Sequence, residues 1–283
     1  MSNSVLTLPS PAKINLHLRV LAKREDGFHA LDTRLCPLSL GDEVTFYPLE
    51  AGETAARLTC SDASLPTDET NLAMKALRSF EKATGQPQQW HLHLEKHIPH
   101  GAGLGGGSSN AAIVLKGLNQ LAGNPLPLEK LHELAAQLGS DVPFFLYDSV
   151  CDATGRGEIL TPVHFPWKLP VVLIKPPFGI PTPWAYQSWA KSAPLKGVLY
   201  APQLCEWGPM VNDLERPVFE KWLLLPTLKM WLLEQIETRA ALMSGSGSTM
   251  LAVAQSGADA EALAAKAKEL CGETTWIQVT EAG

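Results

Sequence analysis

The feature that most constrains how this chain can fold is a run of glycines between a strand-like segment and a helix-like segment. Residues 90–95 alternate apolar and polar side chains, as a β-strand does, and residues 111–121 carry apolar side chains at helical spacing. Between them lie five glycines and three residues of the kind that cap helices: Gly101, Gly103, Gly105, Gly106, Gly107, Ser108, Ser109 and Asn110. Glycine lets successive backbone N–H groups converge, and a helix N-terminus carries partial positive charge. The segment therefore predicts a phosphate site, because a flexible linker need not lead straight into a helix.

Two common phosphate-loop patterns do not explain this segment. The Walker A pattern, G-x-x-x-x-G-K-[ST], fails because no lysine follows the glycines. Gly101, Gly103 and Gly106 match the dinucleotide pattern G-x-G-x-x-G, which also needs a second strand that ends in an acidic residue about 20 positions later. Residues 123–127 are instead a turn with glycine and proline that leads into a helix, so an NAD-dependent enzyme is disfavoured.

The remaining patterns predict a mixed α+β chain in two lobes. Residues 10–21 alternate apolar and polar side chains, so Lys13, Asn15 and His17 share one face of a strand. Further strands are expected at residues 171–174, 249–254 and 275–280, helices at 70–84, 128–138 and 258–270, a loop at 175–183 and a second glycine-rich turn at 244–248. The pattern changes after residue 148, and a boundary near residue 160 gives domains 1–160 and 161–283.

Composition narrows the class of protein. The 283 residues carry a net charge of −6, which gives no electrostatic reason to expect nucleic-acid binding. The 5 cysteines are widely spaced and include no C-x-x-C, as in proteins of a reducing compartment. Residues 1–8 lack the basic and apolar regions of a signal peptide, and no apolar run approaches the roughly 18 residues of a membrane span. We therefore expect a cytoplasmic protein with no membrane partner.

Four histidines raise the alternative of a metal site: His91, His93, His97 and His100. Their spacing matches no known pattern of metal ligands. Because His91 and His93 share one face of the expected strand, an ordinary solvated face is the favoured interpretation.

The glycine segment closely resembles the phosphate-binding motif of the GHMP kinase superfamily, whose members are ATP-dependent kinases of small molecules. The match runs from Pro99 through Gly103, Leu104 and Gly105 to the serines at 108 and 109 and the alanines at 111 and 112. The resemblance implies a two-lobed α+β fold, with an N-terminal ATP-binding lobe, a C-terminal lobe and the active site between them. It also implies that residues 101–110 wrap the phosphates of ATP, with the hydroxyls of Ser108 and Ser109 near the phosphates or Mg²⁺.

Blocks on both sides of this segment narrow the resemblance to the 4-diphosphocytidyl-2-C-methyl-D-erythritol kinase family of the non-mevalonate isoprenoid pathway. These blocks lie, in the family's order, at residues 10–16, 26–29, 139–145, 155–158, 180–183, 212–215 and 244–247. The resemblance implies an enzyme that uses ATP and Mg²⁺ to phosphorylate the 2-hydroxyl of 4-diphosphocytidyl-2-C-methyl-D-erythritol, giving the 2-phosphate and ADP. The protein ligands of Mg²⁺ stay unassigned.

The resemblance also implies a catalytic pair. Asp141 corresponds to the family's catalytic aspartate, and Lys13 to the lysine that contacts this aspartate and the substrate. Phosphoryl transfer needs positioning, charge neutralisation and a group that orients or deprotonates the attacking hydroxyl. A carboxylate is far less basic than an alkoxide and accepts the proton late, so geometry matters more than basicity. Asn15 is expected to hydrogen-bond the substrate.

Four further positions match substrate residues of the family: Phe28 and Tyr186, which would stack on cytosine, His29, which would contact the cytosine edge, and Thr182. The first of these positions usually carries tyrosine in the family. Phe28 keeps the ring face and lacks the hydroxyl. Lys96 and Asn71 align with residues that line the adenine pocket, although Asn71 equally fits a helix N-cap.

Two other functions stay open at this point. A GHMP kinase of the homoserine or mevalonate type would share the fold, but the aromatic residues and His29 argue for a cytosine-bearing substrate. A catalytically silent regulator with the same fold would signal through a partner, which the presence of Lys13, Asn15 and Asp141 disfavours. The expected partner is a small-molecule substrate, with the protein as a monomer or weak homodimer.

Overall fold

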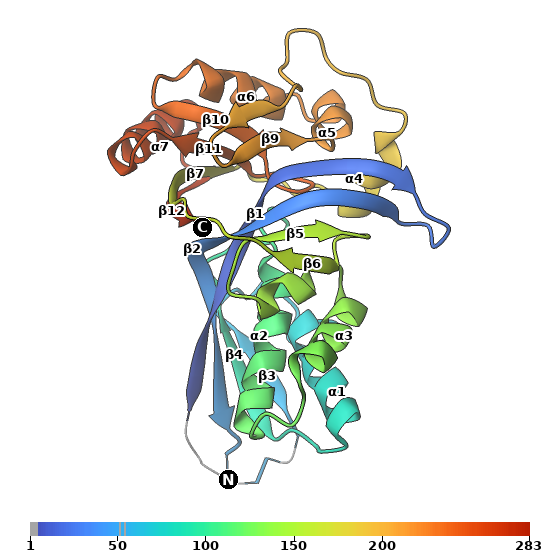
Figure 1. Cartoon of the computed structure of the whole chain (residues 1–283). Coiled ribbons are helices and arrows are strands. Elements are labelled where there is room, and N and C mark those ends of the chain that lie inside the picture. The colour runs from blue at the N-terminus through green and yellow to red at the C-terminus, as the bar shows by residue number, and fades with distance from the viewer. Residues whose placement is uncertain (1–4, 51, 54) are drawn as a thin grey trace. The chain divides into compact units, whose positions relative to one another are not determined.

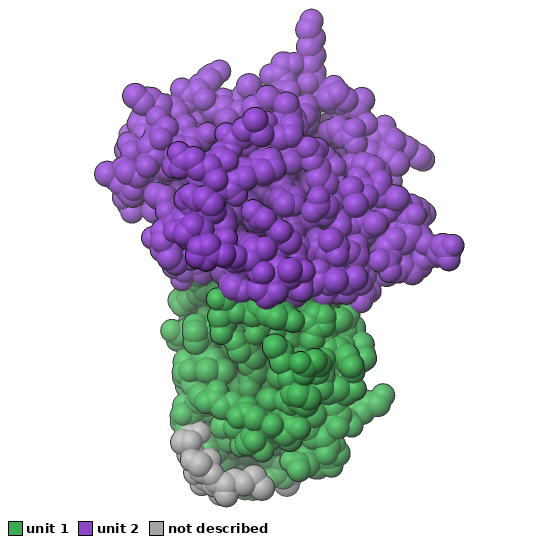
Figure 2. All heavy atoms as spheres, in the orientation of Figure 1, with its two compact units in different colours: residues 1–12, 40–98, 105–148 green, residues 13–39, 99–104, 149–283 purple. Residues whose placement is uncertain are grey.

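The computed structural model describes residues 5–50, 52–53 and 55–283, in two compact units (Figure 2). Unit 1 comprises Met1–Ala12, Leu40–Ile98 and Gly105–Asp148, and unit 2 comprises Lys13–Ser39, Pro99–Leu104 and Ser149–Gly283. The units are interleaved along the chain, because two long strands and the glycine segment each pass from one to the other. The expected division into domains 1–160 and 161–283 stays a prediction. The expectation about residues 1–8 also stays one, since residues 1–4 lie outside the described part.

In its described residues, unit 1 combines three α-helices and a 3₁₀ helix with paired strands. Its strands are one part each of β1 (Leu6–Lys23) and β2 (His29–Pro48), with β3 (Arg57–Cys60) and β4 (Trp90–Glu95). Its helices are α1 (Leu72–Thr84), α2 (Gly106–Leu121) and α3 (Leu128–Leu138), followed by the 3₁₀ helix η1 (Val142–Leu146), and Figure 1 shows α1, α2 and α3 gathered together. Strand β4 pairs antiparallel with β2 and parallel with β3. Helix α2 packs closely, since a Cβ at Gly117 would lie 2.2 Å from the ring of the buried Phe46.

The sequence predicts that residues 108–110 cap the start of α2, and this prediction is wrong. The helix begins at Gly106, and its N-cap is Gly105, which has φ 74° and makes no side-chain capping hydrogen bond. Glycine adopts this left-handed conformation without a Cβ penalty, so the chain enters the helix earlier than the serines suggest. Helices α1 and α3 lie where expected. Asn71 Oδ1 caps α1 by accepting from the Ala73 N–H at 2.9 Å.

Unit 2 contains the rest of β1 and β2 and most of the C-terminal chain. Its other strands are β5 (Cys151–Thr154), β6 (Ile159–Pro162), β7 (Leu169–Lys175), β8 (Gln203–Cys205), β9 (Gly208–Asn212), β10 (Thr238–Met243), β11 (Met250–Ala254) and β12 (Trp276–Ala282). Its helices are α4 (Thr182–Trp189), α5 (Glu215–Lys221), α6 (Leu224–Glu234) and α7 (Gly257–Cys271). The strands follow the order β10-β11-β7-β12-β2-β1-β9-β8, with β5 on β2 and β6 on β5. Because α4 begins at Thr182, the loop expected at residues 175–183 is shorter than expected.

The core of unit 2 surrounds its central strands. All five residues of β11 are buried, and β11 lies between β7 and β10 with α6 and α7 packed nearby. The core also encloses a charged pair: Lys229 Nζ lies 2.6 Å from Glu215 Oε2, with 1% of each side chain exposed. Glu215 Oε1 accepts from the Met243 N–H at 2.9 Å. This pair ties α5 and α6 to β10.

Two findings bear on the expected environment of the chain. No helix in the described residues has the length and apolar character needed to cross a membrane. The five cysteines are free thiols, and burial raises the pKa of Cys36 to about 12. A buried thiol of this kind behaves as a small apolar side chain.

Candidate active site

The N-terminus of α2 presents backbone donors that the helix itself does not use. The Ser109 N–H donates to the Gly105 carbonyl at 2.9 Å, whereas helix geometry gives the N–H groups of Gly106, Gly107 and Ser108 no partner within the helix. The N-cap residue, Gly105, has no side chain with which to cap this end. Converging donors at the positive end of a 16-residue helix favour a bound anion.

Within unit 2, the first part of the glycine segment is bonded to the second glycine-rich turn. Ser244 Oγ donates to the Gly103 carbonyl at 3.0 Å, and the Thr249 N–H donates to the Ala102 carbonyl at 3.2 Å. Gly103 has φ 78°, and a Cβ there would lie 2.3 Å from the Ser244 carbonyl oxygen. Only glycine fits this contact, so residues 99–104 and 244–249 form one local structure.

Lys13 and Asn15 lie together against the second glycine-rich turn. Both are almost fully buried, and Lys13 Nζ donates to Asn15 Oδ1 at 2.9 Å. Asn15 Nδ2 donates to Thr33 Oγ1 at 2.8 Å, which orients the amide. A Cβ at Gly245 would lie 3.4 Å from Lys13 Nζ, so the ammonium reaches the backbone of that turn. The shared strand face predicted for these residues is what brings them into contact.

Asp141 stands at the first position before η1 in unit 1. It is half-buried, and its side chain makes no capping hydrogen bond to that helix. The four residues that follow it are buried and apolar: Val142, Pro143, Phe144 and Phe145. Capping of η1 by its side chain therefore does not account for an aspartate at this position.

Three predicted nucleotide residues belong to a buried network centred on Asp42. Lys96 forms an ion pair with Asp42 and donates to Asn110 Oδ1 at 3.0 Å. Asp42 Oδ1 also accepts from the His97 and Ile98 N–H groups, each at 2.8 Å. Ser109 Oγ accepts from Ser10 Oγ at 2.8 Å and is fully buried. These hydrogen bonds tie the chain that follows β4, at residues 96–98, to the first turn of α2.

The predicted cytosine residues gather in unit 2. The rings of His29 and Tyr186 stack with centroids 5.8 Å apart and planes 23° apart. Phe28 is 49% exposed, and the guanidinium of Arg156 lies 5.0 Å from its ring centroid. Burial, followed by the charge of Lys23, lowers the pKa of His29 below the ordinary histidine value.

Thr182, the remaining residue predicted to bind the substrate, contacts the second glycine-rich turn, residues 244–248. Thr182 Oγ1 and Ser246 Oγ share a hydrogen bond of 2.7 Å at the start of α4. Asn212 Nδ2 donates to the carbonyls of Met243 and Gly245, each at 2.7 Å. Residues 244–248 are therefore held by side chains from several elements of unit 2.

Comparison with known proteins decides the family. Residues 71–149 match the family described as GHMP kinases N terminal domain. The chain is 44% identical over 245 residues to the 4-diphosphocytidyl-2-C-methyl-D-erythritol kinase of Methylacidiphilum infernorum, an alignment that covers 86% of this chain and 84% of that protein. The chain belongs to the 4-diphosphocytidyl-2-C-methyl-D-erythritol kinase family.

Solved structures agree with this membership. A crystal structure of 4-(cytidine 5'-diphospho)-2C-methyl-D-erythritol kinase has 34% identity and a TM-score of 0.80, with 98% of this chain and 100% of that chain covered. The homoserine kinase of Cytophaga hutchinsonii, at 19% identity and a TM-score of 0.70 over 99% of this chain and 95% of that chain, shares the fold alone. The mixed α+β GHMP kinase fold expected from the sequence is confirmed.

Sequence patterns did not predict several residues around the site of this 4-diphosphocytidyl-2-C-methyl-D-erythritol kinase family member. Asp42, Thr33 and Trp189 each contact a predicted residue, and each comes from a segment without a motif. Asp42 is buried, but one sequence does not distinguish a buried aspartate from an exposed one. In the described residues, no three His, Cys, Asp or Glu side chains are grouped to hold a metal ion.

Proposed function

We propose that this chain is an ATP-dependent kinase that phosphorylates the 2-hydroxyl of 4-diphosphocytidyl-2-C-methyl-D-erythritol, giving the 2-phosphate and ADP in the non-mevalonate isoprenoid pathway. The observation that carries the proposal at the site is the uncapped N-terminus of α2 after the left-handed Gly101, Gly103 and Gly105. Backbone donors of this kind bind phosphate without a basic surface, in keeping with the net charge of −6.

Residues 101–110 would hold the phosphates of ATP through backbone N–H groups. The half-buried Ser108 offers its hydroxyl at the start of α2, whereas Ser109 and Asn110 are committed to Ser10 and Asp42. We therefore assign Lys96, Ser109 and Asn110 the role of fixing this segment behind the phosphates. Asn71 caps α1 and supports the adenine pocket by the same kind of indirect contact. Pro99 and Leu104 shape the entry to the segment.

Asp141 and Lys13 would act on the attacking hydroxyl. The 2-hydroxyl oxygen forms a new bond to the γ-phosphorus as the bond from phosphorus to the β–γ bridging oxygen breaks, and ADP leaves. The hydroxyl proton passes to the Asp141 carboxylate, and the Lys13 ammonium stabilises the developing charge on the oxygen. Asn15, oriented by Thr33, hydrogen-bonds the substrate near Lys13.

The cytidine end of the substrate would lie at the aromatic residues of unit 2. Phe28 and Tyr186 offer ring faces for stacking on cytosine, and His29 contacts its polar edge. Thr182 contributes at the start of α4. Phe28 has no hydroxyl, so any hydrogen bond at that position comes from another residue.

The donor set present fits Mg²⁺ held mainly by nucleotide. Mg²⁺ usually keeps several waters and takes one or two carboxylates along with substrate phosphates, so a protein cage is not needed. The Ser108 hydroxyl is the candidate group from this chain. The ion would neutralise charge on the phosphates of ATP.

The cellular setting follows from the same proposal. A kinase of a small, soluble metabolite needs neither a nucleic-acid nor a membrane partner, and we place this one in the cytoplasm. We propose a monomer or weak homodimer.

A purified-protein assay tests the proposed function. ADP release is followed with 4-diphosphocytidyl-2-C-methyl-D-erythritol, homoserine and mevalonate as alternative acceptors, each with ATP and Mg²⁺. We expect turnover with the cytidylyl alcohol only. Turnover confined to homoserine or mevalonate would refute the substrate, and no turnover with any of them would favour a silent regulator.

A further inference from the structure

Trp189, the last residue of α4, contacts the side chain assigned to the cytosine edge. Its ring centroid lies 6.0 Å from that of His29, with the two planes at 76°. Tyr186 stacks on the same imidazole at 5.8 Å and 23°. Because Tyr186 and Trp189 are three residues apart on one helix, they share a face and meet His29 together. Contacts with two rings therefore restrict the orientation of the imidazole.

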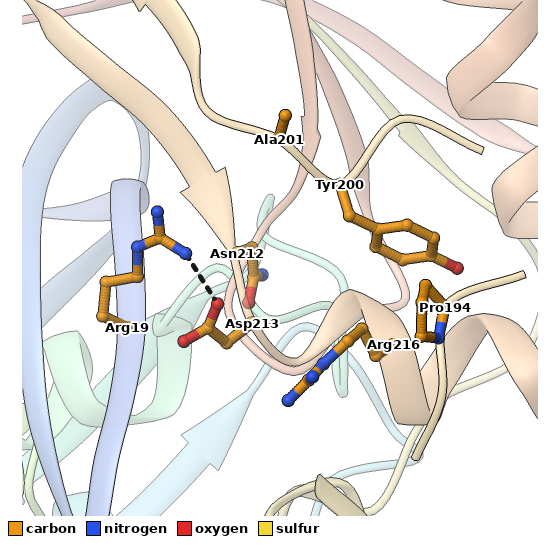
Figure 3. Close-up of a pocket in the computed structure, with 7 residues that line it drawn as sticks. All are labelled: Arg19, Pro194, Tyr200, Ala201, Asn212, Asp213 and Arg216. Carbon is orange, nitrogen blue, oxygen red and sulfur yellow. Dashed lines mark hydrogen bonds and ion pairs between the residues drawn. The ribbon is translucent and has the colours of Figure 1, made fainter.

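Arg216 of α5 also contacts Trp189. Its guanidinium carbon is 5.5 Å from the ring centroid of Trp189. Arg216 lines a cavity of about 430 Å³. Figure 3 shows it there together with Arg19 and Asp213. Asp213, which lines the same cavity, is already paired, since Arg19 Nη1 donates to its Oδ1 at 3.0 Å and the Val20 N–H donates to its Oδ2 at 2.9 Å.

The guanidinium of Arg216 therefore makes a cation–π contact with the indole of Trp189. Among the described residues, Arg216 Nε is buried without a hydrogen-bond partner, and so is Trp189 Nε1. The attraction between a guanidinium and an indole ring is stronger where the two groups are partly shielded from water, as they are here.

We propose that Trp189, with Arg216 behind it, is a positioning residue that orients His29 for cytosine and so sets the preference of this site for cytosine over uracil. The inference rests on the proposed function, because it assigns His29 to the base. Cytosine and uracil differ at the polar edge, where an amino donor in one base is replaced by a carbonyl acceptor in the other. An imidazole held at one angle distinguishes them, and a freely rotating one does not.

The test compares Trp189→Ala with Trp189→Phe, which keeps an aromatic ring against His29. Trp231→Ala is the matched control, since Trp231 is also partly buried against the core of unit 2. We expect Trp189→Ala to raise the KM for the cytidylyl substrate about fivefold, with kcat and the KM for ATP nearly unchanged. The ratio of CDP affinity to UDP affinity, measured by calorimetry, should fall by a similar factor. Trp189→Phe should restore most of both, and Trp231→Ala should move neither.

Arg216 supplies a second, independent pair of variants. Arg216→Gln removes the cation and keeps a polar stem, and we expect about a threefold loss in the CDP to UDP ratio, with partial recovery in Arg216→Lys. This pair decides the matter if Trp189→Ala does not fold. The proposal is overturned if the ratio is unchanged in the Trp189 and Arg216 variants, or if Trp231→Ala lowers it equally. Failure of the wild-type chain to phosphorylate the cytidylyl alcohol would instead overturn the proposed function, since the affinity ratio needs no turnover.

Discussion

At the scale of single residues, some side chains of the site could be predicted from the sequence and others could not. Lys13 and Asn15 could be placed on one strand face by alternation alone, and the structure brings them into a 2.9 Å hydrogen bond. Asp141 needed the family resemblance, because an aspartate in a turn is ordinarily a capping residue. No sequence pattern pointed to Asp42, because its partners His97 and Ile98 lie far from it in the sequence and meet it only in the folded chain.

The first prediction concerns Asp141. Asp141→Asn keeps the size of the side chain but removes the proton acceptor, so kcat should fall by roughly 10²–10⁴-fold. Nucleotide binding, measured by calorimetry, should stay near the wild-type value because the phosphates are held elsewhere. A variant with unchanged kcat would remove Asp141 from the mechanism.

The second prediction concerns the protonation of His29. Its pKa lies below the ordinary value of 6.5, so the ring is neutral at pH 7. The folded pKa is lower than the unfolded one, so the stability due to the neutral ring is fully present above pH 6.5 and declines as the pH falls toward the folded pKa. We expect the KM for the cytidylyl substrate to stay constant above pH 6.5 and to rise below the folded pKa. His29→Gln should abolish this rise, and a rise that persists in this variant would exclude His29 as its source.

At the scale of elements, local patterns predicted most helices but missed one of the longest strands. Strand β2 pairs with β5 through Thr33–Leu35 and with β4 through Glu43–Pro48, so its two parts face different partners. No single alternation describes such a strand. The glycine segment was predicted as a phosphate site, but its contact with residues 244–249 depends on tertiary packing and has no local signal.

The third prediction tests the fit of Gly103. Gly103→Ala should raise the KM for ATP by at least about tenfold and lower stability, because its Cβ would lie 2.3 Å from the Ser244 carbonyl oxygen. Gly123→Ala is the matched control: Gly123 also has positive φ, at 82°, but a Cβ there would meet nothing within 4 Å. The control should lose only about 1–2 kcal/mol of stability and keep its KM. Equal effects in the two variants would show that backbone strain alone matters.

At the scale of the whole molecule, alternation, helical periodicity and the family motif predicted a mixed α+β fold, which the structure and its relatives confirm. The interleaving of the two units could not be predicted, because the sequence of β1 and β2 does not mark where a continuous strand passes from one unit to the other. Nor did the sequence reveal the buried pair of Glu215 and Lys229, since charged residues are usually exposed.

The fourth prediction concerns that pair. Lys229→Met leaves the Glu215 carboxylate buried without its partner, so the free energy of unfolding should fall by about 3–5 kcal/mol. Lys130→Met, which breaks the exposed pair with Glu133, should cost less than about 1 kcal/mol. Urea unfolding measures both changes. Similar small losses in the two variants would contradict the structural role assigned to the buried pair.

The most direct test of the central claim is the identity of the product. Phosphorus NMR of a reaction with ATP, Mg²⁺ and 4-diphosphocytidyl-2-C-methyl-D-erythritol should show a new phosphomonoester attached at the 2-position, in equal amount to ADP. A phosphate on another hydroxyl would contradict the proposed positioning by Lys13, Asn15 and Asp141. ADP formed without any phosphomonoester would contradict the proposed kinase activity.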